Sequence, residues 1–253
     1  MTLAAAVDIF TRDGGAFISR WAHVLFGITW IGLLYYFNFV QVPAFAQMEA
    51  AARNNAIDKL ASRALWWFRW AAVATFLSGI LIYVFQVNNG TMVWADGDYM
   101  KKLPGISIVT GMSLAIIMLL NVWGVIWRNQ KIVIASARGV QEGKEADPRA
   151  AEAGRKALMA SRQNTIFSLP MLLFMVGTTH FAYGNAEPAG GTRAIYWAVV
   201  FVVTLLLELN ALGVFGKGPC GTRIIYDTHK AAIITGLVLV VLYGGWFAYG
   251  LAI

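Results

Sequence analysis

Residues 106–127 are ISIVTGMSLAIIMLLNVWGVIW, a run of 22 residues without a charged side chain. About 20 mostly apolar residues in a helix are enough to cross the hydrocarbon core of a bilayer. The apolar residues are continuous and do not alternate with polar ones, which favours a helix over a strand of a membrane β-barrel. This stretch therefore predicts a transmembrane helix.

Similar apolar stretches recur along the whole chain. The 253 residues are 58% hydrophobic and only 13% charged, whereas soluble domains carry about 25% charged residues. No linker rich in charge, Gly/Ser or Pro divides the sequence, so we predict a single domain over residues 1–253. It is an all-α integral membrane bundle of about six transmembrane helices. The predicted spans cover about 17–46, 65–86, 106–127, 165–183, 195–215 and 228–251.

The basic residues predict the orientation, because Lys and Arg gather in the cytoplasmic loops of membrane proteins. Fifteen of the 20 fall between spans one and two, three and four, or five and six. The other five are Arg12, Arg20, Lys101, Lys102 and Arg193. Both termini are therefore expected outside the cytoplasm. The same bias explains the net charge of +7, so nucleic acid is not an expected partner.

Two local features limit the chemistry and the connections. Cys220 is the single cysteine, which excludes an internal disulfide, a covalent c-type haem site and any cysteine-based metal cluster within the chain. Between spans three and four, Asp147 followed by Pro148 is typical of a helix N-cap and first helical position. We expect the helix that starts there to lead directly into span four.

Three histidines, all in or beside predicted spans, are the first candidates for chemistry, since ionisable residues inside membranes are often functional. His23 and His180 both lie near the outer ends of their spans, at a similar depth. Two such imidazoles suit axial ligation of a b-type haem, with the iron as their metal. Arg20, one turn before His23, is a candidate partner for a haem propionate. Alternatively, both histidines simply hydrogen-bond to neighbouring helices.

A second group of polar residues lies in the inner halves of the spans. Glu208 is the one carboxylate deep within a span, and Asn121 falls at a similar depth. His229 begins the last span near the inner surface. These three residues predict a proton path or polar network, and a purely structural hydrogen-bond network explains them equally well.

The first span also resembles a known family. Residues 20–45, RWAHVLFGITWIGLLYYFNFVQVPAF, resemble the N-terminal membrane domain of the bacterial membrane-bound urate hydroxylases, the urate oxidase N-terminal family. The runs ALWWFRWAA at 64–72 and GKGPCGTR at 216–223 are similar to it as well. More distantly, the histidine followed by a Trp-x-Gly run is similar to short membrane-type protoporphyrinogen oxidases, which bind haem b.

The resemblance implies a helical domain of the bacterial inner membrane, with periplasmic termini, that passes electrons to a cytochrome c. It supports His23 most directly. Full-length members continue into a C-terminal cytochrome c domain, which this sequence, ending at Ile253, lacks. We therefore expect a haem-b electron-transfer subunit, or the membrane part of a urate hydroxylase-like oxidoreductase. A cytochrome c or another redox subunit would bind at the outer face.

Two other functions are compatible with the same residues. The first is a non-redox accessory subunit of a larger membrane complex or homo-oligomer, with the same fold and no cofactor. The second is a transporter or channel, although the sequence has no evident inverted repeat or pair of broken helices. The sequence does not define the substrate, the redox partner or the oligomeric state.

Overall fold

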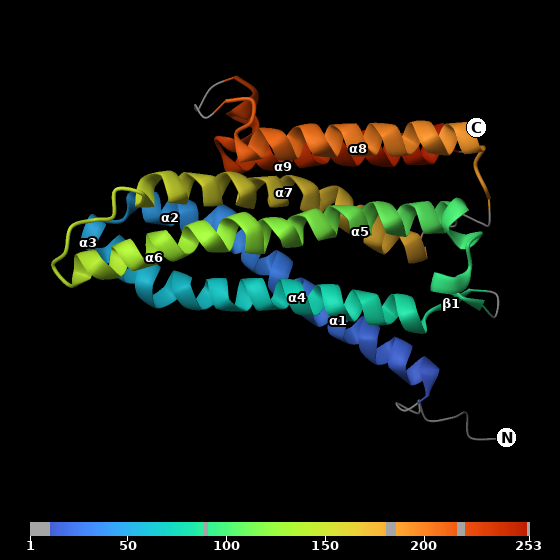
Figure 1. Ribbon diagram of the computed structural model, residues 1–253, viewed down its shortest axis with the longest axis horizontal. Coiled ribbons are helices and arrows are strands. Elements are labelled where there is room, and N and C mark those ends of the chain that lie inside the picture. The colour runs from blue at the N-terminus through green and yellow to red at the C-terminus, as the bar shows by residue number, and fades with distance from the viewer. Residues whose placement is uncertain (1–10, 89–90, 181–185, 217–220, 252–253) are drawn as a thin grey trace.

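The computed structural model describes residues 11–88, 91–180, 186–216 and 221–251, and these form a bundle of long helices (Figure 1). Several helices continue through π-helical segments. The first long stretch consists of Arg12–Tyr35 (α1), Tyr36–Gln41 (η1) and Val42–Gln47 (α2). The second consists of Ala50–Ala56 (α3), Ile57–Ala61 (η2) and Ser62–Phe85 (α4). The third consists of Leu103–Asn121 (α5), Val122–Ile126 (η5) and Trp127–Gln141 (α6). The remaining three are Ala150–His180 (α7), Gly190–Leu212 (α8), and His229–Leu239 (α9) with Val240–Gly244 (η7) and Trp246–Gly250 (η8).

Short elements close the connections between the long helices. A two-residue antiparallel ladder pairs Val87–Asn88 (β1) with Thr91–Met92 (β2). The 3₁₀ turns are Val93–Ala95 (η3), Tyr99–Lys101 (η4) and Gly221–Tyr226 (η6). The all-α membrane bundle expected from the sequence is therefore confirmed, with minimal extended structure in the described residues.

Five of the long stretches in the described part of the chain are long and apolar enough to cross a membrane: 12–47, 50–85, 103–141, 190–212 and 229–250. The sixth expected span, 165–183, lies mostly within α7, which is not among these five. Residues 181–183 fall outside the described residues.

Helix α7 nevertheless runs beside a spanning helix for most of its length. Asn164 Nδ2 donates to the carbonyl of Met118 at 2.9 Å, and Ser107 Oγ donates to the carbonyl of Phe174 at 3.2 Å. These bonds align α7 antiparallel to α5 over ten residues. Along this stretch the polar groups of α7 therefore face α5, where they find hydrogen-bond partners.

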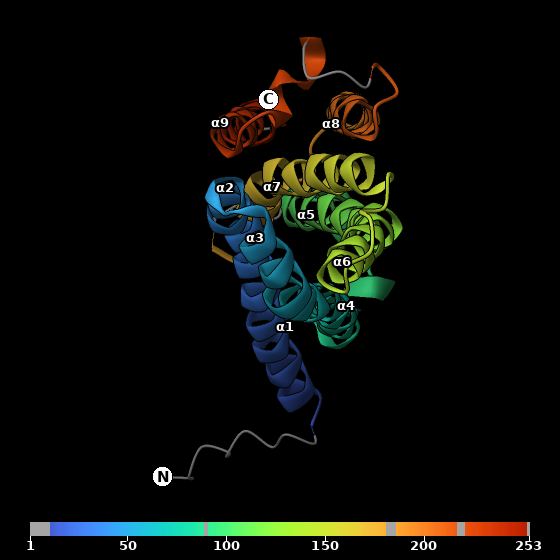
Figure 2. The same cartoon turned by 90° about the vertical axis from the view of Figure 1, so that its left-hand side faces the viewer.

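The helices form three layers, best seen along the bundle (Figure 2). Helices α5 and α7 lie in the middle, α1 and α4 pack on one side, and α8 and α9 lie on the other. Helix α1 leaves the bundle as it approaches its N-terminal end, where it stays in contact with α4 (Figures 1 and 2). The middle layer contains most of the fully buried side chains.

Small residues allow close packing against α7. A Cβ added to Gly236 of α9 would lie 2.9 Å from the carbonyl oxygen of Ile166, and one added to Gly111 of α5 would lie 3.2 Å from Met175 Cγ. Gly111 begins one of the small-xxx-small pairs in the sequence, a pattern that permits close helix approach. Aromatic pairs fill the rest of this core, including Phe174 against Phe247 at 5.4 Å between ring centroids.

The connection between α6 and α7 is shorter than the polar stretch between the predicted spans, because α6 continues as a helix to Gln141. Asp147 Oδ1 accepts from the backbone N–H of Arg149 at 2.9 Å, as expected of an N-cap, and α7 begins at Ala150. The Arg149 side chain and backbone N–H together lower the pKa of Asp147 to about 2. The helix from this cap into span four is continuous, as predicted.

We call the end of the bundle where α1, α5 and α8 begin the outer end, and the opposite end the inner end. Helix α3, the α6–α7 connection and η6 all lie at the inner end (Figure 1). Of the fifteen basic residues assigned to one side, these segments carry Arg53, Lys144, Arg149 and Arg223; Lys217 lies outside the described residues. Lys101, Lys102 and Arg193, from the group of five, lie at or next to the outer starts of α5 and α8.

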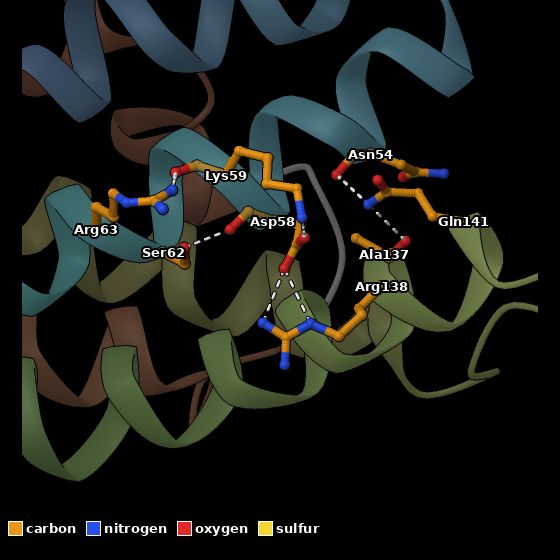
Figure 3. Close-up of polar contacts among 8 residues, drawn as sticks. All are labelled: Asn54, Asp58, Lys59, Ser62, Arg63, Ala137, Arg138 and Gln141. Atoms are coloured by element: carbon orange, nitrogen blue, oxygen red, sulfur yellow. Dashed lines mark hydrogen bonds and ion pairs between the residues drawn. The ribbon is translucent and has the colours of Figure 1, made fainter.

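An ion-pair cluster holds the inner end together (Figure 3). Asp58 of η2 accepts two bonds from the Arg138 guanidinium of α6, at 2.8 and 3.0 Å, and its other oxygen pairs with Lys59 at 2.8 Å. Beside it, Gln141 Nε2 donates to the carbonyl of Asn54 at 3.2 Å. These contacts join the α3–η2 segment to α6.

Candidate functional site

His23 is a half-buried residue of α1 that faces α4. Its Nδ1 is 2.8 Å from the carbonyl oxygen of Thr75, and Ser78 Oγ is 3.4 Å away. Because a carbonyl oxygen only accepts, Nδ1 carries the proton and the lone pair is on Nε2. The ring also packs closely on α4, where a Cβ added to Gly79 would lie 3.1 Å from its Cε1.

His180 ends α7 and is exposed. Its Nδ1 lies 3.0 Å from the carbonyl oxygen of Val176, one turn back, and 2.9 Å from Thr179 Oγ1. By the same argument the proton is on Nδ1 and Nε2 has the lone pair. Histidines that bind metals commonly donate the N–H of one ring nitrogen to a carbonyl in this way. The free Nε2 of each residue therefore fits a ligand of haem iron.

The two histidines lie an equal number of residues from one contact between their helices, but no described contact joins them. Tyr35 Oη lies 2.9 Å from Ser168 Oγ, which fixes α1 against α7. His23 lies twelve residues outward from that contact along α1, and His180 twelve residues outward along α7, so each is about 18 Å away by helical rise. Among the described residues, no contact links the two rings, and His23 faces α4.

His229 lies at the other end of the bundle. Its ring is 5.9 Å from that of Phe39, centroid to centroid. Phe39 is sixteen residues inward from His23 on the same helical stretch, or about 24 Å by rise. His229 therefore lies far inward of His23. The described residues also contain no group of three or more His, Cys, Asp or Glu side chains suited to a metal ion.

Arg20 is exposed on α1, one turn outward from His23. The ion pairs of the described residues do not include it. Also at the outer end, Arg193 Nη1 pairs with Glu187 at 2.7 Å and Lys101 with Asp98 at 2.9 Å. Lys101 lowers the pKa of Asp98 through that hydrogen bond.

The inner polar residues do meet. Asn121 Nδ2 donates to Glu208 Oε2 at 3.1 Å and to Asn164 Oδ1 at 3.0 Å, and Asn164 Nδ2 donates in turn to the Met118 carbonyl at 2.9 Å. This chain connects α5, α7 and α8. Glu208 takes part in none of the ion pairs of the described residues, so its described partner is a neutral amide. His229, the third residue expected here, contacts Phe39 instead.

A cavity of about 330 Å³ lies between α5 and α8, directly beside this chain. Most of its wall is apolar, and the polar residues that line it are Ser113, Asn121, Thr204 and Glu208. Hydrogen bonds between α5 and α8 lie at both ends of the cavity. Thr110 Oγ1 lies 2.9 Å from Tyr196 Oη toward the outer end, and Asn121 contacts Glu208 toward the inner end.

A second group of hydrogen bonds lies inward of the cavity. Tyr226 Oη lies 2.6 Å from Gln163 Oε1 and 2.8 Å from the Leu207 carbonyl oxygen, which share its single hydrogen, while Arg162 Nη1 donates to the Tyr226 carbonyl. Asn164 and Gln163 are fully buried. They are the functional candidates that the sequence argument missed, and the adjacent polar residues RQNT at 162–165 were the available signal.

These features define a multispanning helical membrane protein with a buried polar network between its middle layer and α8. Residues 90–210 match the model of the family described as urate oxidase N-terminal, so this part of the chain is similar to that family. The match contains α5, α7, the cavity, Asn121, His180 and Glu208, but lies apart from the runs at 20–45, 64–72 and 216–223 that carried the sequence resemblance. Comparison with curated proteins and with solved structures found no significant match.

Proposed function

We propose that this protein is a haem-b electron-transfer component of a urate oxidase-like membrane system, with His23 and His180 as axial ligands. The observation that carries the proposal is the shared state of the two histidines. Each donates its Nδ1–H to a backbone carbonyl, which leaves an Nε2 lone pair, and each lies twelve residues outward from the Tyr35–Ser168 contact. Haem b, when bound, would supply one-electron redox chemistry.

The surrounding residues support a position near the outer surface. Arg20 is exposed one turn from His23 and free of described ion pairs, as a propionate partner needs to be. Arg20→Gln should lower the midpoint potential, since a nearby cation favours the reduced form. Electrons would leave toward a cytochrome c or another redox subunit on the outer end, beside Lys101, Lys102 and Arg193.

A reduced-minus-oxidised absorbance spectrum of the purified protein tests the proposal. The wild type should show a b-type spectrum, and His23→Ala or His180→Ala should remove or shift it. His229→Ala is the matched control and should leave it unchanged, because His229 lies about 24 Å inward from His23 by helical rise.

The other outcomes decide between defined alternatives. Loss of haem from His229→Ala alone would contradict the depth argument. A wild type that binds no haem after expression with excess haem would favour the accessory-subunit function. That alternative has its own support, because the His23–Thr75 hydrogen bond is also the contact that a purely structural interhelical histidine makes.

We also propose that the protein resides in a bacterial inner membrane with both termini periplasmic. The support is the division of the 20 basic residues in the sequence, fifteen on one side of the predicted spans and five on the other. A reporter enzyme that is active only in the cytoplasm, fused after Ile253, should be inactive, and the same reporter inserted in the α6–α7 connection should be active. The reverse pattern would invert the orientation. Crosslinking should find a redox partner on the outer end.

A further inference from the structure

The cavity between α5 and α8 opens toward the lipid. Leu120 and Phe201 line it, and their exposed fractions are 63% and 65%. Both belong to helices that are apolar enough to span the membrane, so these exposed side chains face hydrocarbon. A ligand that enters between them must therefore be soluble in the bilayer.

The wall composition limits the ligand further. Leu, Ile and Val side chains from both helices, with the rings of Trp197 and Phe201, form the apolar surface. A volume of about 330 Å³ is at the small end of the range for ligand sites. It suits a single substituted ring with the start of an alkyl tail, and aromatic side chains pack well on such a ring.

The polar end of the cavity selects for a hydrogen-bond donor. Asn121 uses both hydrogens of its Nδ2, one on Asn164 and one on Glu208 Oε2. The described bonds of Glu208 involve Oε2, which leaves Oε1 to accept from a ligand. Because Asn164 is in turn fixed on the Met118 carbonyl, the carboxylate is oriented before a ligand arrives, and orientation in advance reduces the cost of binding.

We propose that this cavity binds the ring of a lipid-soluble quinol, with a ring hydroxyl donating a hydrogen bond to Glu208. The tail would leave between α5 and α8 into the bilayer. Thr204, whose hydroxyl lies 2.9 Å from Tyr243 Oη, lies on α8 one helical turn outward from Glu208 and lines the same wall. The proposal concerns binding and includes no redox step, so it does not depend on the haem ligands.

The geometry predicts a switch in ligand preference for Glu208→Gln. The new amide should satisfy Asn121 Nδ2 with its oxygen, which turns its NH₂ toward the cavity. A donor then replaces an acceptor, so the variant should favour a quinone carbonyl over a quinol hydroxyl. Loss of a hydrogen bond to a carboxylate should weaken quinol binding about tenfold or more, while quinone binding should be unchanged or stronger.

The experiment measures binding of decylubiquinol, under anaerobic conditions, and of decylubiquinone to the full chain in lipid nanodiscs, by titration calorimetry. Wild type should prefer the quinol, and Glu208→Gln should reverse the preference. Leu205→Trp should abolish binding of both forms, because Leu205 lines the cavity. Leu206→Trp is the matched control: Leu206 is the adjacent residue, exposed to 49% and not part of the cavity wall, and it should bind as wild type.

Three results would overturn the proposal. The first is wild type that binds the quinol no more tightly than decanol, which would identify the cavity as a general alkyl-chain site. The second is Leu205→Trp that binds like Leu206→Trp. The third is equal effects of Glu208→Gln on the two redox forms. If Glu208→Gln does not fold, the Leu205 and Leu206 pair still decides whether this cavity is the site, and failure of Leu205→Trp to block binding rejects it.

Discussion

Helices α7 and α8 are both long helices of the bundle, yet they differ in almost every other respect. Helix α8 is apolar over most of its length, with exposed Phe201, Val202 and Leu206 on its surface. Helix α7 carries a buried run of polar side chains from Arg162 to Thr165. One helix is in contact with lipid over much of its surface, and the other lies within the middle layer between protein neighbours (Figure 2).

The difference shows where a membrane protein can place polar chemistry. Polar groups on α7 are tolerated because α1, α5 and η6 each supply a hydrogen-bond partner. Helix α8 carries one deep carboxylate, Glu208, at the point where it meets that polar layer. The candidate ligand cavity lies at this boundary, with its polar end toward the middle layer and its apolar rim in lipid.

The largest expected difference between the two helices is in aromatic packing. Phe174→Ala on α7 removes a ring that is 1% exposed and packed on Phe247, so the free energy of unfolding should fall by about 3–5 kcal/mol. Phe201→Ala on α8, where the ring is 65% exposed, should change it by no more than about 0.5 kcal/mol. SDS titration in mixed micelles measures both, and similar losses would mean that α8 is buried in an assembly.

A smaller loss of stability should follow from adding a methyl group where α9 packs closely against α7. Gly236→Ala places a methyl group 2.9 Å from the Ile166 carbonyl oxygen and 2.8 Å from Leu169 Cδ1. Such overpacking should cost about 1–3 kcal/mol of unfolding free energy. Gly245→Ala is the control, because a Cβ there meets nothing within 4 Å. A neutral Gly236→Ala would show that α9 moves freely against α7.

The smallest effect concerns the polar chain. Asn164→Leu removes the bonds to the Met118 carbonyl and to Asn121, and hydrogen bonds between membrane helices contribute modestly, so the loss should be about 1 kcal/mol. Asn129→Leu is the matched control, because Asn129 bonds only to the Val125 carbonyl of its own helix among the described contacts. If the two variants lose equal stability in the same SDS titration, the chain through Asn164 does not join the helices.

Most of the fold followed from the sequence. Uncharged runs such as 106–127 predicted spanning helices, and the Asp147–Pro148 pair predicted the start of α7. The exact helix ends were less predictable: α6 continues to Gln141 because a solvated polar helix carries no apolar run to mark it.

The candidate sites were only partly predictable. The sequence identified Glu208 and Asn121 because isolated polar residues in apolar spans are conspicuous, and the structure joins them at 3.1 Å. The sequence did not identify Asn164 as their link, since hydrogen-bond partners come from helices far apart in the chain. It also grouped His229 with them, whereas the structure positions that ring against Phe39.

The sequence by itself determined that this chain is a membrane helical bundle, because hydropathy depends on composition within each segment and needs no knowledge of neighbours. Only the tertiary structure decided which helix lies in the middle, which face of each helix meets lipid, and where polar residues meet. The physical reason is that a polar side chain in a membrane is stable only when another segment supplies its partner, and that pairing is a property of the packed bundle.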